Sequence, residues 1–491
     1  MTGLRRQSTY LIVLVAGPIV PIALSFAGLL VARSLSPTVY GRVAYFFSAF
    51  NLITILWQLG LGPLATGEVA RSTRAGGIRA AAQVTPPYLI ARLVSLALLI
   101  PVGIGAALLG DPIVASASAA AGIALLAIFA QALTQGLGYA GLVGSVQIAQ
   151  ALLYLIVIVI WAKDAPERVF LAVGATYALS LIAMAWASRS VVPNITRWWT
   201  LSRGRWRSTT QAVGWLYAIA LLQTPYSSLA VIGLGNLGRF EDAGSFSIAL
   251  TIPTLMAVSA ATIISIQYYP ELCHVLPDSP LDARQHFDRL YRLLAWVGIT
   301  AAAVLASQPA TVIAVLFTAA YATAVAPLAA LSLAALILPM VQLALWTLIA
   351  HRVWRWAVAV AAMELVGVIP FIGVALVLPQ TPLWVLAAGH TFGAVAGLVI
   401  GVAGLWRLRA GYDWRPWRVG LASVTAVLVA LGACAIVGTY GILSVAIATA
   451  VVLGCAGLVI WSPEIVSVSA PWRATRSSRR SDARSADVGL E

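Results

Sequence analysis

The sequence predicts an all-α membrane protein that crosses the bilayer about fourteen times. Hydrophobic residues make up 61% of its 491 residues and charged residues only 9%, which is too few charges to cover a soluble protein. The apolar segments are close to 20 residues long and lack the alternation typical of strands, so they are expected to be helices. Arginines gather in every second loop, as membrane topology requires.

The predicted spans follow one another through short connections. Each apolar run is long enough to cross the hydrocarbon core as a helix. In chain order they are 9–32, 39–62, 86–109, 113–136, 140–162, 169–188, 211–234, 244–267, 294–315, 324–348, 354–377, 384–407, 417–438 and 440–461. In the loop before the ninth span, we expect a short amphipathic helix through Phe287, Leu290 and Leu294.

The distribution of basic residues predicts the orientation. With the N-terminus in the cytoplasm, 24 of the 30 Lys and Arg residues lie on the inner side, five lie outside, and Arg92 lies within a span. This asymmetry follows the positive-inside rule, so we expect a multi-pass protein of the plasma (inner) membrane with both termini cytoplasmic. The net charge of +14 is then explained by orientation, and no nucleic-acid partner is expected.

The chain divides into two similar sets of six spans. A basic loop at 189–210 separates them, and Tyr40-Gly41 in the first set aligns with Ala243-Gly244 in the second. Both sets start inside, so they form a parallel repeat about an axis along the membrane normal. The predicted units are an N-lobe at 1–199, a C-lobe at 200–410, two extra helices at 411–461 and a disordered basic cytoplasmic tail at 462–491.

The sequence carries no recognisable enzyme motif. Its three cysteines show no CxxC spacing, so we expect neither a metal centre nor a cofactor. A membrane glycosyltransferase would need acidic residues in a sizeable outer loop. Asp111, Asp164 and Glu167 instead sit in tight outer connections, which makes an enzyme the least favoured reading.

Polar side chains within the spans are the candidates for a substrate site. Amides at mid-span could line a central cavity and bind sugar hydroxyls, or could simply join neighbouring helices by hydrogen bonds. Glu364 could couple transport to protons or could be a protonated structural residue. Arg92 could bind a ligand or could meet Glu68 at the inner end of the second span. The substrate-cavity candidates are Asn51, Gln58, Arg92, Gln131, Gln150, Gln223, Glu364 and His390.

Glu364 and His390 are not expected to pair directly. Counted from the inner ends of their spans, they differ in depth by roughly 10 Å at the helical rise. On the span of His390, glycines recur at 389, 393, 397 and 401, a small-residue ladder that predicts close packing against another helix.

Several stretches resemble the polysaccharide and O-antigen (Wzx-type) flippases of the multidrug/oligosaccharidyl-lipid/polysaccharide (MOP) exporter superfamily. The stretches are ARSLSP at 32–37, Tyr40-Gly41, GLG at 60–62, EVAR at 68–71, LFTAAY at 316–321 and APL at 326–328. The resemblance implies two six-helix lobes in a V-shaped, MATE-like arrangement with two additional C-terminal helices. It also implies alternating access and no cofactor.

The implied substrate is a polyprenyl-diphosphate-linked oligosaccharide for cell-surface polysaccharide synthesis. Membrane lipids and a polysaccharide polymerase or glycosyltransferase are the implied partners, and the monomer is the expected functional unit. Related flippases often carry several cations in the cavity, whereas here Arg92 is the one arginine clearly within a span. The alternative is an ion-coupled drug or cation antiporter of the same superfamily, which would need intramembrane carboxylates in the first lobe.

The repeat also predicts an outer gate. It places the outer tips of the two lobes face to face, with Arg33 and Arg42 on one and Arg239, Glu241 and Asp242 on the other. We expect Arg33 or Arg42 to pair with Glu241 or Asp242 when the outer side closes. The alternative is that these are solvated turn charges.

Overall fold

The computed structural model describes residues 23, 25–58, 61–108, 112–162, 166–192, 206–276, 279–378 and 380–408. The predicted spans at 417–438 and 440–461, the basic tail, most of the first span and most of the basic loop at 189–210 therefore lie outside the described residues.

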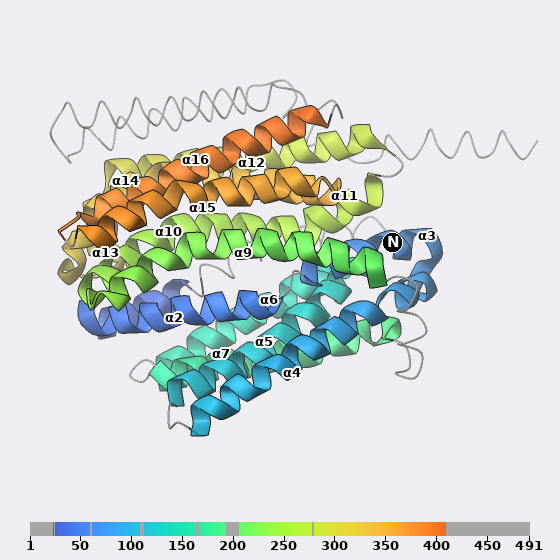
Figure 1. Ribbon diagram of the computed structural model, residues 1–491, viewed down its shortest axis with the longest axis horizontal. Helices are drawn as coiled ribbons and strands as arrows, with labels where there is room; N and C mark the ends of the chain where they lie inside the picture. Colours follow the sequence, from blue (N-terminus) through green and yellow to red (C-terminus); the bar gives the residue numbers. More distant parts are fainter. Residues whose placement is uncertain are drawn as a thin grey trace, which may run out of the picture.

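The described residues form an almost entirely helical bundle (Figure 1). The helices are α2 (Pro37–Gln58), α3 (Leu61–Val84), α4 (Pro86–Leu108), α5 (Pro112–Gly136), α6 (Ala140–Val157), α7 (Pro166–Ser188), α9 (Trp206–Asn236), α10 (Phe240–Ile263), α11 (Tyr269–Val275), α12 (Pro280–Ser307), α13 (Pro309–Leu316), α14 (Val325–Ala350), α15 (Trp354–Val377) and α16 (Leu383–Arg407). Short π-helical and 3-10 segments are η1 (Ile158–Ala162), η2 (Arg189–Val191), η4 (Ile264–Tyr268) and η5 (Ala319–Ala324).

The helices fall into two groups with α2 between them. The first helix group, α3–α7, packs mainly through α5, and the second, α9–α16, packs around α14 (Figure 1). The chain enters the first group through α2, which lies against α9 and α10 of the second group. We call the end of the bundle that holds the α9–α10 turn the outer end. The opposite end, with the turn inside α3 and the α14–α15 turn, is the inner end.

Among the described residues, nine helical stretches are long and apolar enough to cross a membrane. The two halves of α9, Gln211–Gln223 and Ser228–Asn236, are bent by 53° and pass the same test as a pair. The bend surrounds Pro225, a residue type that removes a backbone donor and kinks helices. An all-helical, multi-pass membrane protein is therefore confirmed.

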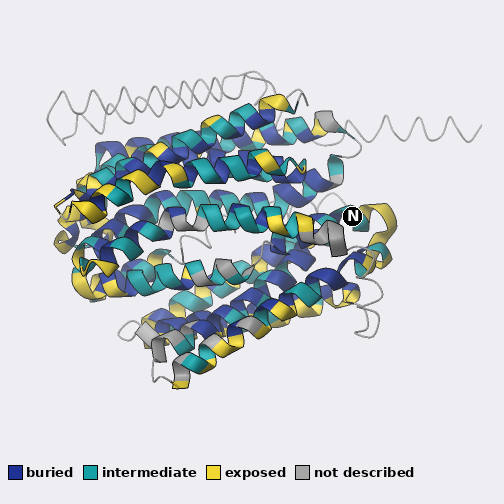
Figure 2. Ribbon diagram, viewed as in Figure 1, coloured by how far each residue is buried: buried dark blue, intermediate teal, exposed yellow. Residues whose placement is uncertain are grey.

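Buried residues are found inside both helix groups, and exposed residues lie at their ends and outer faces (Figure 2). Nearly every residue of α14 in the stretch from Leu331 to Ala350 is buried, so this helix is the centre of the second group. At the periphery of the first group, α4 exposes large apolar side chains, including Leu93, Ile100 and Leu108. An exposed apolar face of this kind suits contact with lipid acyl chains.

Two regions differ most from the sequence-based prediction. The helix expected at 294–315 ends at Ser307, because Pro309 disfavours helical backbone in the residue before it, and it begins already at Pro280. The amphipathic stretch through Phe287 is thus the first part of α12. The second span, expected to end at 62, is followed by helical backbone in α3 as far as a turn at Gly76 and Gly77. Hydropathy alone could not show this extension, because α3 is polar.

Candidate functional site

At the outer end, α2 and α10 cross at two glycines. A Cβ built on Gly41 would lie 1.7 Å from the carbonyl oxygen of Phe240, and one on Gly244 would lie 2.6 Å from that of Pro37. The same positions align in the sequence repeat, so each tip inserts its glycine against the backbone of the other. Only a residue without a side chain permits this approach. We call this crossing the outer seam.

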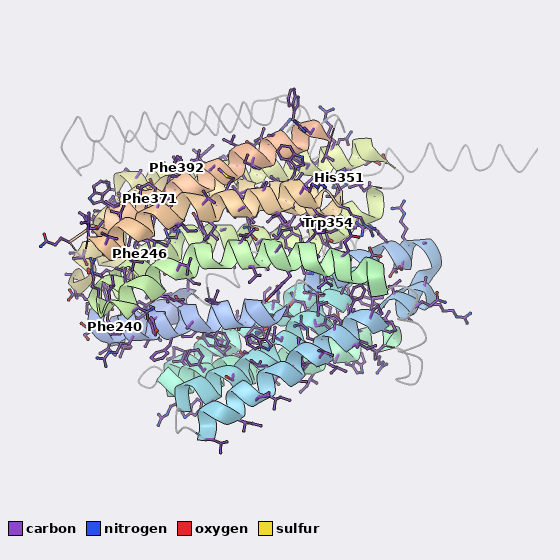
Figure 3. The ribbon with its side chains drawn as sticks, in the orientation of Figure 1. Phe240, Phe246, His351, Trp354, Phe371 and Phe392 are labelled. Atoms are coloured by element: carbon purple, nitrogen blue, oxygen red, sulfur yellow. The ribbon has the colours of Figure 1, made fainter. Side chains whose placement is uncertain are left out.

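Further contacts strengthen the outer seam. Tyr45 of α2 donates a hydrogen bond to Oδ1 of Asn236 at 3.0 Å and packs its ring onto Gly235. Tyr321 of η5 donates to the carbonyl of Ala32 at 3.0 Å. Figure 3 shows Phe240 at this end, next to α2. The outer ends of the two repeats therefore meet face to face, as the sequence repeat predicts.

The gate charges have other described partners than those expected. Arg33 donates to the carbonyls of Val315 at 2.6 Å and Phe317 at 3.2 Å, where it caps the end of α13. The guanidinium of Arg42 lies 5.4 Å from the ring centroid of Phe240.

The acidic gate candidates lie on the first turn of α10. Asp242 forms an ion pair with Arg239 at 2.7 Å, on its own side of the seam. Glu241 is exposed. In this conformation the outer seam is held by glycine packing and backbone capping, and the charge pairing between tips stays a prediction.

At the inner end, α3 contacts the second group through ionic and polar groups. Tyr269 of α11 donates to the carbonyl of Pro63 at 3.0 Å. Glu68 accepts from Arg71 at 3.1 Å and from Arg352 of the α14–α15 turn. Described contacts thus join α2 to the second helix group at the outer end, and α3 to the same group at the inner end.

A buried polar cluster lies inside the second group. Gln223 of α9 donates to Oε2 of Glu364 at 3.2 Å, and Tyr226 donates to the backbone carbonyl of His390 at 2.7 Å. Glu364 is 2% exposed and His390 is fully buried, with its ring edge-on to Tyr226. The structure therefore places both ionisable candidates inside the second helix group. Glu364 of α15 lies against Gly393 and Gly397 of α16, the helix that carries His390, and no described ion pair joins the two side chains.

The glycine ladder of α16 makes this cluster compact. A Cβ on Gly393 would lie 2.3 Å from the carbonyl oxygen of Glu364, and one on Gly397 would lie 2.8 Å from its Cγ. Gly389 in turn faces the ring of Phe371. The ladder is the packing face toward α15, which confirms its sequence-based interpretation.

Arg92 of α4 is buried, with 1% exposure. Its Nη1 donates at 3.2 Å to the carbonyl of Trp57, near the end of α2, and its guanidinium lies 5.6 Å from the ring centroid of Phe129. Late carbonyls of a helix lack intrahelical donors. The position of Arg92 therefore suits stabilisation of the α2–α3 junction.

The remaining amide candidates are spread over three helices. Asn51 of α2 is exposed, while Gln131 of α5 and Gln150 of α6 are half-buried. The side chain of Gln58 lies outside the described ones. Among these amides, Gln223 is the one with a described side-chain hydrogen bond to another candidate, Glu364.

Sequence reasoning missed the inner contact of Glu68 with Arg352. Arg352 counted only toward topology, because a charged residue between two spans is ordinary. The available signal was its position just after a helix end, where glycine is the usual residue.

No protein-family model and no curated protein matches the chain. Solved MATE transporters share its fold. A mutant of the Vibrio cholerae MATE transporter VcmN superposes with a TM-score of 0.64 at 16% identity, covering 84% of this chain and 99% of that one. An outward-facing MATE transporter of the MOP superfamily gives 0.57 at 16% identity, with 82% and 96% covered.

A MOP superfamily transporter from Pyrococcus furiosus, described as having a binding pocket of reverse polarity, also gives 0.57 at 16% identity, with 82% and 95% covered. At these identities the likeness concerns the fold. The described part of the chain therefore has the helix arrangement of the MATE transporters.

Proposed function

We propose that this protein is a transporter that moves a lipid-linked oligosaccharide from the inner to the outer leaflet of the cytoplasmic membrane by alternating access. The fold of MATE transporters supports transport, and the stretches that resemble polysaccharide flippases support the substrate class. The contacts of α2 with the second helix group at the outer end, and of α3 with it at the inner end, fit alternating access, in which one set breaks while the other holds.

One observation favours the glycan over a cationic drug. From residue 1 to 199 the acidic residues are Glu68, Asp111, Asp164 and Glu167, and none of them lies in the middle of a predicted span. The spans of this half instead carry amides such as Gln131 and Gln150, which can bind sugar hydroxyls without charge. The proposal gives Arg92 no role in binding the diphosphate, because its guanidinium is turned to a backbone carbonyl.

The second candidate is an ion-coupled antiporter of drugs or cations. The buried carboxyl of Glu364, hydrogen-bonded to Gln223 inside the second group, is the observation that favours it. A carboxyl within the membrane is costly and is a candidate for ion coupling. In this reading Glu364→Gln would abolish gradient-driven efflux while the protein still folds, because the amide keeps the shape and the hydrogen bond.

Deletion of the gene tests the proposal. A flippase deletion is expected to accumulate lipid-linked saccharides on the inner leaflet, measured by extraction and mass spectrometry of the lipid fraction. The chain itself, expressed from a plasmid, must restore the normal pool. A normal pool together with altered sensitivity to drugs or ions would favour the antiporter.

A further inference from the structure

The turn between α14 and α15 has an unusual residue for its backbone. The N–H of Val353 donates to the carbonyl of Leu348 at 3.0 Å and that of Arg352 to Ile349 at 2.9 Å. These two bonds define a Schellman helix end, whose penultimate residue takes a positive φ and is usually glycine. Here that residue is Arg352, with φ of 59°.

The same turn occurs twice more in the described chain, and both times with glycine. Gly138 after α5 has φ of 85° and Gly238 after α9 has φ of 74°, with the same pair of backbone bonds at each. A side chain in this conformation clashes with the following carbonyl, so arginine strains a turn that glycine would close freely. The backbone of this turn therefore favours glycine, and the reason for an arginine must lie in the contacts of its side chain.

The side chain of Arg352 reaches across to the first helix group. Its Nη2 bonds to Oε1 of Glu68 on α3. In the opposite direction, Arg71 of α3 donates to the carbonyl of Ala350 at 3.1 Å, at the end of α14. Each helix group thus contributes an arginine to the other, and Glu68 accepts from both arginines.

The surroundings of this contact bring α11 and α3 close together and leave the charge to arginine. A Cβ on Gly67 would lie 2.5 Å from the hydroxyl of Tyr269, so the small residue admits α11 close to α3. Burial lowers the pKa of the His351 imidazole below its ordinary value, which favours the neutral form, and the positive charges beside Glu68 come from Arg352 and Arg71. Figure 3 shows His351 at the inner end, opposite Phe240.

We propose that Arg352, Glu68 and Arg71 form an ionic latch that holds the two helix groups together at the inner end. The latch breaks whenever that end opens. The contact of its side chain with Glu68 accounts for an arginine in this strained turn. The inference rests on the proposed alternating access, but its test needs no substrate and is independent of what is transported.

A native cysteine beside the latch can report whether the latch is open. Cys273 of α11 is 1% exposed, and its Sγ lies 3.6 Å from Nη2 of Arg71. With Cys434 and Cys455 replaced by serine, the rate at which a maleimide labels Cys273 in the purified full-length protein measures opening of the inner end. Arg355→Gln is the matched control, since Arg355 is an exposed arginine three residues further along.

Glu68→Gln and Arg352→Gly should each raise the labelling rate, by about two- to fivefold, the range expected for a partly exposed ion pair. Arg352→Lys and Arg355→Gln should label as the parent protein does. The double variant Glu68→Gln/Arg352→Gly should label no faster than Glu68→Gln alone, because both changes break the same contact.

Thermal unfolding separates the latch from a merely structural role. Glycine suits the turn, so Arg352→Gly should keep or raise the Tm while labelling becomes faster. Unchanged labelling in both Arg352→Gly and Glu68→Gln would overturn the proposal. So would strictly additive rates in the double variant.

Discussion

The glycine crossing at the outer seam makes a sharp prediction for Gly41→Ala. The new Cβ would lie 1.7 Å from the carbonyl oxygen of Phe240, whereas contacts below 3.0 Å essentially do not occur. The two helices must therefore separate by roughly 1.3 Å, and overpacking of this kind costs about 1–3 kcal/mol. The strain exists only while the outer end is closed, so the ratio of open to closed states should rise about 5- to 150-fold.

Spin-label distances can measure this shift. Val39 on α2 and Leu237 in the α9–α10 turn are both exposed at the facing tips and can carry labels in a background with all native cysteines replaced by serine. Gly41→Ala should move the distance distribution to longer values. Gly373→Ala is the control, because a Cβ there meets nothing within 4 Å. An unchanged distribution in Gly41→Ala would refute the reasoning that close glycine packing closes the outer end.

Three further changes should alter the stability of the protein, measured by thermal unfolding in detergent. Arg33→Ala removes two charged hydrogen bonds to the end of α13 and should lower stability by about 1.5–3 kcal/mol, whereas Arg33→Lys should lose less. Glu364→Ala should destabilise more than Glu364→Gln, because alanine leaves a cavity and the Gln223 amide without its acceptor; equal losses would argue against that contact. Gly393→Ala should reduce folded yield or Tm, since its Cβ would lie 2.3 Å from a backbone oxygen of α15, while Gly62→Ala meets nothing within 4 Å and should be tolerated.

Much of the fold could be predicted because bilayer-spanning helices must be long, apolar and bounded by charge. The expected span at 140–162 matches α6 with η1, and the one at 354–377 matches α15. The polar helix α3 could not be predicted in this way, because its stability comes from packing against α5 and α11 and not from hydropathy.

The candidate site was predictable in part. The repeat brought Gly41 and Gly244 together in the sequence alignment, and they meet in space. The partners of the gate charges were not predictable. A repeat shows which positions correspond, but it does not show which backbone carbonyls lie close to a side chain, and Arg33 donates to two such carbonyls. The depth argument predicted that Glu364 and His390 do not pair directly. It could not show that both lie inside one helix group, because the helical rise gives the depth of a residue and not the direction in which its side chain points.

The most direct test of the proposed function is translocation by the purified protein in vesicles. A fluorescent polyprenyl-diphosphate oligosaccharide placed in one leaflet should become accessible to a quencher on the other side faster than in vesicles without protein. Gly41→Ala, which disfavours closure of the outer end, should slow this exchange. Translocation no faster than in protein-free vesicles, with the same preparation driving efflux of a cationic dye along an ion gradient, would contradict the flippase and establish the antiporter in its place.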